Sequence, residues 1–346
     1  MKIIIDSKIP FIKGRIETAA SRAGTDVEVL YVDPADITRD AVRDATALII
    51  RTRTRCDAAL LGGSGVRLVV TATIGTDHID LQWCADNGIE VRNAAGCNAP
   101  GVAQYVWSAL LRHGFTIPGS TIGVVGAGNV GSIVAEWGKR LGARVLVCDP
   151  PRQRAGHADH DYVSLREVLA ESDAVTIHTP LTHDGLDPTY HLVGEKELDA
   201  MRHGAILINT SRGPVVDNEA WSRHIAAGKG RAIVDVWEGE PAISRSLLAG
   251  AMIATPHIAG YSFEGKQRAT RMALRAAGEC LGLDIPLDGL CGDYVSPGEN
   301  LKPENAEIIV NSYDPGVDDA ALRADPASFE RLRGDYDYRH EPFIRQ

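Results

Sequence analysis

The sequence predicts an α/β protein made of two doubly wound parallel-sheet domains. Its 346 residues, 44% of them hydrophobic, exceed one ordinary core and suffice for two. Short apolar runs alternate with helix-like stretches along the chain, which is the βαβ rhythm of parallel sheets. A glycine-rich turn follows one of these runs directly, as in nucleotide-binding sheets.

The first sheet is predicted from three runs, residues 1–6, 47–50 and 66–71, and we expect it to be flavodoxin-like. A helix over 100–111, with Val102 and Val106 on one face, leads into the second sheet. That sheet should be of the Rossmann type, with six strands. They are expected at 121–125, 144–148, 174–178, 205–209, 231–236 and 252–255.

These elements predict one domain at 1–94, completed by 262–281, and a second, nucleotide-binding domain at 95–261. A helix over 267–280 is expected to return to the first domain. Residues 282–346 are rich in turn residues and then charged and helix-like over 318–333. We expect a small C-terminal α+β segment there: an accessory element, a dimerisation element or a partly disordered end.

Composition excludes several classes of function. A net charge of −10 argues against nucleic acid or an anionic membrane as a partner. The N-terminus does not have the pattern of a signal peptide, and no run has the length and apolar character of a transmembrane helix. The six cysteines are scattered without metal-ligand spacing, so reduced thiols, no metal and a cytoplasmic location are expected.

The glycine turn is the most informative motif. Residues 121–131 place a strand, a tight turn and a helix start in succession, with glycines at 126, 128 and 131. Gly126 permits the turn, Gly128 lets the backbone approach a pyrophosphate, and Gly131 lets helix and strand pack closely. Asn129 and Val130 begin the helix whose N–H groups would face the phosphates.

Asp149 follows the next strand, 18 residues after Gly131, where a ribose-binding carboxylate is expected. Its charge would repel a 2′-phosphate, so NAD is favoured over NADP, although Arg152 and Arg154 keep NADP open. Taken alone, Asp149 would be interpreted as a helix-capping residue before Pro150.

Three stretches at the ends of later strands, 209–213, 235–241 and 255–260, resemble in order and spacing the D-isomer-specific 2-hydroxyacid dehydrogenases. This resemblance implies Arg212, Glu240 and His257 as the catalytic residues, with Glu238 as a weaker competitor for the glutamate. Histidine suits removal of a proton near neutral pH, a carboxylate orients it, and arginine binds a substrate carboxylate. The resemblance also implies that Asp235, Thr179 and Gly260 contact the cofactor.

Four further stretches, 71–78, 95–99, 148–152 and 257–266, resemble members of this family that act on a phosphorylated 2-hydroxy acid. They imply substrate contacts at Thr52, Thr73 and Tyr261, and the backbone near Gly75 should help to hold the substrate carboxylate. Arg51 and Arg55 follow a first-domain strand and are the better phosphate ligands, since alternation in an extended segment would turn Arg53 away.

Two alternatives remain open. The same arginine, glutamate and histidine would serve a dehydrogenase for another D-2-hydroxy acid, such as 3-phosphoglycerate or glycerate. A protein of another class, an NAD-sensing corepressor, could use the same fold. The family resemblance also implies a homodimer.

Overall fold

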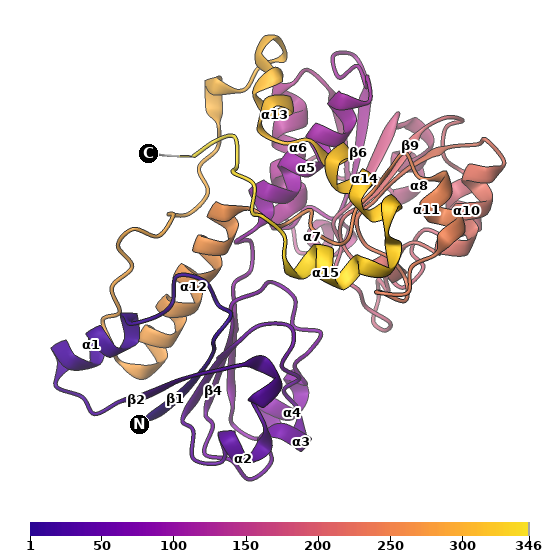
Figure 1. The fold of residues 1–346 in the computed structure, drawn as a ribbon. Coiled ribbons are helices and arrows are strands. Elements are labelled where there is room, and N and C mark those ends of the chain that lie inside the picture. Colours follow the sequence, from indigo (N-terminus) through magenta and orange to yellow (C-terminus); the bar gives the residue numbers. More distant parts are fainter. Residues whose placement is uncertain (345–346) are drawn as a thin grey trace. The chain divides into compact units, whose positions relative to one another are not determined.

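The computed structural model describes residues 1–344 and divides into two compact units (Figure 1). Unit 1 consists of Met1–Asn98 and Phe263–Tyr294, and unit 2 of Ala99–Ser262 and Val295–Gln346. No helix within residues 1–344 is both long and apolar enough to cross a bilayer.

Unit 1 contains a five-stranded, all-parallel sheet with the strand order β2-β1-β3-β4-β5. The strands are β1 (Lys2–Asp6), β2 (Glu28–Val32), β3 (Ala47–Ile50), β4 (Leu68–Thr71) and β5 (Glu90–Asn93). This is the flavodoxin-like order, so the predicted fold class of this unit is confirmed.

β1, β3 and β4 lie at the three predicted places, whereas β2 and β5 were not predicted. The three central strands are buried along almost their whole length, whereas β2 and β5 form the two edges and have no fully buried residue. β5 carries mixed polar and apolar residues and lacks the continuous apolar run that reveals a central strand. β2 does contain such a run, residues 29–32, and the prediction missed it.

Helices cover both faces of this sheet. They are α1 (Arg15–Ala23), α2 (Arg39–Val42), α3 (Ala58–Leu61), α4 (Leu81–Asp86) and α12 (Phe263–Leu281). Ile3 and Ile5 pack with α1 and α12, while Ile4 packs on the opposite face with α2, α3 and α4. The alternation along β1 follows from the two-residue period of a strand.

Unit 2 contains a six-stranded parallel sheet at the six predicted places. The strands are β6 (Thr121–Val125), β7 (Arg144–Cys148), β8 (Ala174–Ile177), β9 (Ile206–Asn209), β10 (Arg231–Val234) and β11 (Ile253–Ala254). Their order is β11-β10-β9-β8-β6-β7. A further parallel bridge joins Tyr162 to Val147 of β7, so the Rossmann order is present with one edge strand reduced to a single bridge.

The order reverses between β6 and β8, which is where such sheets bind dinucleotides. The surrounding helices are α5 (Ala99–Arg112), α6 (Asn129–Arg140), α7 (Pro150–Arg154), α8 (Leu165–Glu171), α9 (Glu195–Asp199), α10 (Asn218–Ala226) and α11 (Arg245–Gly250). The predicted helix at 100–111 corresponds to α5, but residues 99–110 are buried all round rather than on one face.

The tail beyond residue 282 is divided between the two units. Leu283 and Leu290 pack into the core of unit 1, whereas Leu322 and Phe329 pack into the core of unit 2. The helices of the tail are α13 (Glu307–Ser312), α14 (Pro315–Ala324) and α15 (Phe329–Gly334). The helix-like stretch 318–333 is thus two helices, because Pro326 cannot continue α14.

The tail is tied into unit 2 by specific contacts. Asp319 of α14 accepts a 2.7 Å hydrogen bond from the Ala254 N–H of β11. Arg323 donates to the carbonyl oxygens of Leu248 (2.6 Å) and Ala251 (2.8 Å) at the end of α11. Figure 1 shows α14 and α15, in yellow, against the sheet of this unit. The described part of the tail is therefore part of a folded core.

Candidate active site

The turn between β6 and α6 has the geometry that its glycines require. Gly126 has φ +91°, and a Cβ there would lie 2.7 Å from the His178 carbonyl oxygen. A Cβ on Gly131 would lie 1.8 Å from the Gly126 carbonyl oxygen. A Cβ on Gly128, by contrast, would lie more than 4 Å from every atom of the described residues other than its own chain neighbours. The turn is therefore closed on the protein side and open where a pyrophosphate would approach.

Asp149 links this turn to the next strand. One carboxylate oxygen accepts a 2.8 Å hydrogen bond from the Ala127 N–H, and the other accepts one of 3.0 Å from the Arg152 N–H at the start of α7. Asp149 thus caps a helix, as its position before Pro150 indicates, and also braces the glycine turn. Its remaining lone pairs can still accept a ribose hydroxyl.

The two arginines that keep NADP open are engaged elsewhere. Arg152 donates to Asp159 (2.9 Å) and to the Tyr162 hydroxyl (3.2 Å). Arg154 forms a two-pronged ion pair with Asp187. Because carboxylates already neutralise both guanidinium groups, this geometry favours the 2′-hydroxyl of NAD over a 2′-phosphate.

Two side chains after β8 bear on cofactor binding. The Thr179 hydroxyl is buried and has no hydrogen-bond partner among the described residues. A buried hydroxyl without a partner costs free energy, so a ligand group that bonds to it would be favoured. Burial lowers the pKa of the neighbouring His178 imidazole to about 3, so that ring is neutral at neutral pH. Its Nε2 atom shares a 2.9 Å hydrogen bond with the Thr176 hydroxyl. Thr179 and the open space at Gly128 both fit a bound dinucleotide.

Asp235, after β10, is buried and organises the loop that carries His257. Its carboxylate accepts hydrogen bonds from the Thr255 hydroxyl (2.6 Å) and from the N–H groups of Ile258 (2.8 Å) and Ala259 (3.0 Å). Burial raises the pKa of this carboxyl, against the opposing effect of these hydrogen bonds and of His257. Oδ2 accepts one of the three bonds and retains a lone pair for an amide N–H.

His257 and Glu240 form the central pair of the site. The Nδ1 atom of His257 lies 2.8 Å from Oε2 of Glu240, and both side chains are mostly buried. The other oxygen of Glu240 accepts a 2.9 Å hydrogen bond from the Trp237 N–H. Burial alone would raise the pKa of Glu240, but the hydrogen bond and charge of His257 outweigh it and lower that pKa. The glutamate is therefore ionised at neutral pH, and Nε2 of His257 is the nitrogen left to face a substrate.

Glu238 is placed differently from Glu240. It lies 2.7 Å from Nε2 of His191 and accepts a 2.9 Å hydrogen bond from the Asn218 N–H. Only Glu240, of the two, reaches His257.

Arg212 stands in the loop after β9, which is in contact with the loop that carries Glu240. Asn209 donates a 2.9 Å hydrogen bond to the Arg212 carbonyl oxygen and fixes the backbone there. A Cβ on the next residue, Gly213, would lie 2.0 Å from the Trp237 backbone. Glycine is thus required where the two loops touch, three residues from Glu240.

Tyr261 has a partner that the motifs did not reveal. Its hydroxyl accepts a 3.2 Å hydrogen bond from Nε of Arg333 in α15, and Arg333 is also among the charges that lower the pKa of Glu240. The tail carries no motif, and in the sequence Arg333 is one charge among many on a charged helix. Only its place in the fold distinguishes it.

In unit 1, both expected phosphate ligands are held by aspartates. Arg51 lies 3.0 Å from the buried carboxylate of Asp6, and the exposed Arg55 lies 2.7 Å from Asp57. The expectation that residues 51–55 alternate in an extended segment is wrong. The Thr54 N–H bonds to the Arg51 carbonyl oxygen, so the chain turns here and alternation does not decide where Arg53 points.

The other expected substrate contacts of unit 1 lie around the end of β4. The Thr73 hydroxyl lies 2.6 Å from that of Thr71 and 3.4 Å from the Gly75 carbonyl oxygen, to which it donates. Asn93 donates a 2.7 Å hydrogen bond to the Ile74 carbonyl oxygen and steadies the same loop. Thr52 is exposed in the turn after β3.

Comparison with known proteins defines the class. Residues 92–259 match the model of the D-isomer specific 2-hydroxyacid dehydrogenase, NAD binding domain. A solved structure, the TT0316 protein from Thermus thermophilus, superposes with a TM-score of 0.65 at 27% identity over 83% of this chain and 99% of its own. Fold and site thus define a D-isomer specific 2-hydroxyacid dehydrogenase, and NAD is the cofactor of the matched domain, as predicted.

Curated relatives narrow the class to one family. An erythronate-4-phosphate dehydrogenase from Bacteroides fragilis is 43% identical, with 99% of this chain and 97% of the relative aligned. One from Pseudomonas paraeruginosa is 41% identical, with 99% and 93% aligned. The chain belongs to the family of erythronate-4-phosphate dehydrogenases.

Proposed function

We propose that the chain oxidises 4-phospho-D-erythronate at C2 with NAD, giving (R)-3-hydroxy-2-oxo-4-phosphooxybutanoate, as a step in pyridoxal 5′-phosphate biosynthesis. Family membership supports the substrate. The observation that carries the chemistry is the 2.8 Å contact between His257 Nδ1 and Glu240 Oε2.

His257 is proposed as the general base. Its Nδ1–H is donated to the ionised Glu240, so Nε2 is the basic nitrogen and takes the proton from the C2 hydroxyl. The imidazolium that forms is stabilised by the glutamate beside it. As the O–H electron pair becomes the second C–O bond, the C2–H bond breaks and its electron pair leaves with the hydrogen. NAD, when bound, accepts that hydride.

Arg212 is proposed to bind the substrate carboxylate and to polarise the C2 oxygen. A guanidinium can donate two parallel hydrogen bonds to a carboxylate, which orients C2 as well as binding it. The Asn209 contact to the Arg212 backbone supports this role, because a fixed backbone reduces the freedom that the side chain loses on binding.

We propose that Gly126, Gly128, Asn129, Val130 and Gly131 hold the pyrophosphate of NAD, and that Asp149 accepts a hydrogen bond from its ribose. Thr179, Asp235 and Gly260 would serve the nicotinamide end. The Thr179 hydroxyl, which has no hydrogen-bond partner within residues 1–344, and the lone pair left on Asp235 support this assignment. The open space at Gly128 supports the first part of it.

Recognition of the phosphorylated end is assigned to unit 1, where Arg51 and Arg55 supply positive charge. Thr52 and Thr73 supply hydroxyl groups to the substrate, and the backbone near Gly75 is proposed to hold its carboxylate. Tyr261 is proposed as a further substrate contact. Residues 1–94 with 262–281 would thus act as the substrate domain and 95–261 as the NAD domain. We also propose a cytoplasmic homodimer in which 282–346 contributes to the interface, to be tested by light scattering of the purified protein.

The test is a substrate screen that follows formation of reduced nicotinamide. 4-Phospho-D-erythronate, D-erythronate, 3-phospho-D-glycerate and D-glycerate are offered to the purified enzyme. The highest kcat/KM is expected for the first, with Arg51→Met and Arg55→Met raising its KM and the exposed-surface control Arg43→Met leaving it unchanged.

Preference for an unphosphorylated acid or for 3-phosphoglycerate would overturn the substrate. Binding of NAD without turnover of any acid would instead indicate an NAD-sensing protein.

A further inference from the structure

The loop 258–261, directly after His257, is held on its N–H side by one buried charge. The Asp235 carboxylate accepts hydrogen bonds from the N–H groups of Ile258 and Ala259. The Asp235 carbonyl oxygen accepts another from the His257 N–H at 2.8 Å. His257 itself has φ +58°, a left-handed conformation that costs free energy in any residue other than glycine. The catalytic histidine therefore depends on outside contacts to keep its backbone in place.

The carbonyl side of the same loop is held by a charge of opposite sign, Arg339 of the tail. Its Nη1 donates to the carbonyl oxygens of Ile258 (3.1 Å) and Tyr261 (3.0 Å), and its Nη2 donates to that of Ala259. Three of the four residues after the catalytic histidine thus accept hydrogen bonds from one guanidinium through their carbonyl oxygens.

The remaining contacts fix Arg339 to the core of unit 2. Nη2 also donates to the Gly101 carbonyl oxygen at 3.0 Å, and Nε donates to Oε1 of Gln104 at 3.0 Å, both in α5. The guanidinium stacks over the Tyr313 ring at 4.1 Å. All three nitrogens are used, and five N–H donors in one rigid plane are something only arginine offers.

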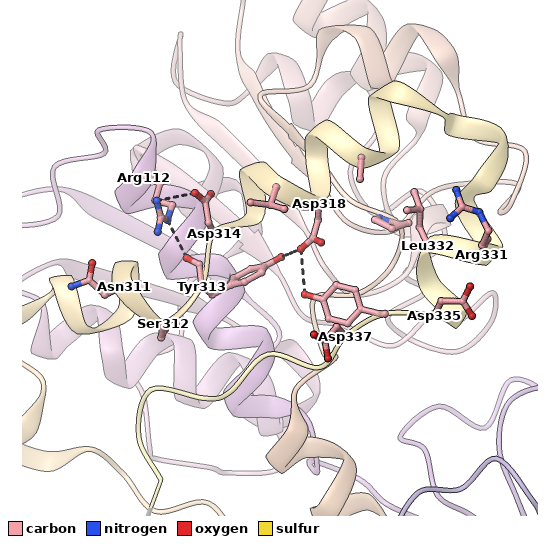
Figure 2. Close-up of a pocket in the computed structure, with 14 residues that line it drawn as sticks. Arg112, Asn311, Ser312, Tyr313, Asp314, Asp318, Arg331, Leu332, Asp335 and Asp337 are labelled. Carbon is pink, nitrogen blue, oxygen red and sulfur yellow. Dashed lines mark hydrogen bonds and ion pairs between the residues drawn. The ribbon is translucent and has the colours of Figure 1, made fainter.

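The Tyr313 ring under this guanidinium is itself fixed at both ends. Figure 2 shows its hydroxyl directed at Asp318, to which it donates at 2.6 Å, while Tyr336 donates to the same oxygen at 3.2 Å. At the other end, Nε of Arg112 donates to the Tyr313 carbonyl oxygen at 3.0 Å. These residues line an open pocket of unit 2, and the ring gives Arg339 a rigid platform.

We propose that Arg339 is a positioning residue for catalysis: with Asp235 it holds the loop 258–261 between opposite charges and so keeps the His257 ring on Glu240. This inference rests on the proposed role of His257 as the base. It gives the C-terminal tail a part in the active site beyond any part in an interface. Arg339 lies outside the matched dehydrogenase model, which ends at residue 259.

The test compares Arg339→Met, which keeps the volume but loses every donor, with Arg339→Lys and with the control Arg331→Met, an exposed arginine of the same tail. A displacement of about 1 Å in a catalytic group costs on the order of 100-fold in rate, so kcat should fall by about that factor in Arg339→Met with a smaller change in the KM of the hydroxy acid. Arg339→Lys should retain an intermediate rate, and Arg331→Met the full rate.

Chemical rescue separates positioning from folding. In Arg339→Ala, millimolar guanidinium should restore part of kcat, because the free ion can occupy the vacated site, whereas Arg331→Ala should not respond. Wild-type kcat in Arg339→Met, or a loss of kcat that guanidinium leaves unchanged in a folded Arg339→Ala, would overturn the proposal.

A second readout does not depend on the substrate. In spectra of protein labelled with ¹⁵N-histidine, the Nδ1–H shared by His257 and Glu240 should give a downfield proton signal that His257→Asn removes. Arg339→Met should shift or broaden this signal, and Arg331→Met should not. An unchanged signal in Arg339→Met would overturn the proposed positioning role of Arg339, even if the wild type oxidised a different acid.

Discussion

The glycine turn and the His257 loop both serve the proposed reaction, but they are built in different ways. The turn and its brace Asp149 lie within residues 126–149, and the hydrogen bond between the two, from Ala127 to Asp149, spans only 22 residues. The His257 loop takes its support from Asp235 and from Arg339, which is 80 residues beyond Ala259. A motif can encode the first region by itself, whereas the second forms only when distant parts of the chain come together.

Removing the imidazole of His257 should have the largest effect and should separate the two regions. His257→Asn suits the left-handed backbone, which asparagine tolerates better than most residues. We expect kcat to fall by about 10²–10⁴-fold, as on loss of a general base, with NAD affinity kept. Steady-state rates and an NAD titration measure the two quantities. Retained kcat would show that another group removes the proton.

Two glycines of the turn offer a matched pair. Gly131→Ala drives a Cβ into the Gly126 carbonyl oxygen, so it should lower the free energy of unfolding by about 1–3 kcal/mol or more. Gly128→Ala meets no described atom within 4 Å beyond its chain neighbours, so it should unfold like the wild type. Its methyl group would instead clash with the pyrophosphate and weaken the binding of NAD by about tenfold or more. Thermal unfolding and NAD titration of both variants test this, and equal NAD affinity in Gly128→Ala and the wild type would contradict it.

Asp149→Asn should have a smaller effect on the same region. Its amide oxygen can replace only one of the two carboxylate acceptors for the Ala127 and Arg152 N–H groups, and it no longer repels a 2′-phosphate. The KM for NAD should rise about tenfold, which corresponds to about 1.4 kcal/mol, and the preference for NAD over NADP should narrow. Kinetics with both cofactors measure the ratio; an unchanged ratio would remove Asp149 from cofactor selection.

Glu240→Gln probes the second region through the pH dependence of stability, and the effect should be the smallest. Burial raises the pKa of Glu240 but His257 lowers it further, so the net shift is downward. A pKa that is lowered in the folded state stabilises the fold at pH values above the ordinary pKa of 4.5. This stabilisation is lost as the pH falls through the lowered pKa. At pH 7 the free energy of unfolding of the wild type should exceed that of Glu240→Gln by about 1 kcal/mol. This difference should disappear in acid.

Urea unfolding from pH 7 down to a pH below the lowered pKa of Glu240 measures that gap, with Glu219→Gln as an exposed control expected to show none. A gap that grew in acid would have the wrong sign for this pair.

The same contrast explains which parts of the fold the sequence could predict. Strands β3 and β4 are buried along their whole length, and all six strands of the second sheet start from recognisable apolar runs. The edge strand β5 carries no such run, and neither does the single bridge at Tyr162. Apolar periodicity reports burial, so exposed elements such as these escape it. β2 does contain an apolar run, residues 29–32, and the prediction missed it.

For the candidate site, the sequence predicts the residues that share a motif but not the residues that contact them. Arg212, Glu240 and His257 stand at the ends of predicted strands, where parallel sheets present functional groups. Arg333 and Arg339 lie in a charged tail in which arginine is ordinary, and their roles arise from packing. The turn at residues 51–54 was also missed, because one backbone hydrogen bond, absent from any residue pattern, decides it.

Gly213 has a mechanical consequence for how such an enzyme can diverge. Because no side chain fits between it and the Trp237 backbone, the loops that carry Arg212 and Glu240 form one rigid block. A shift of one loop to suit a new substrate would drag the other away from His257. With the proposed assignment of substrate contacts to unit 1, changes of specificity are therefore expected to accumulate there, around Arg51 and Thr73, while this block is inherited intact.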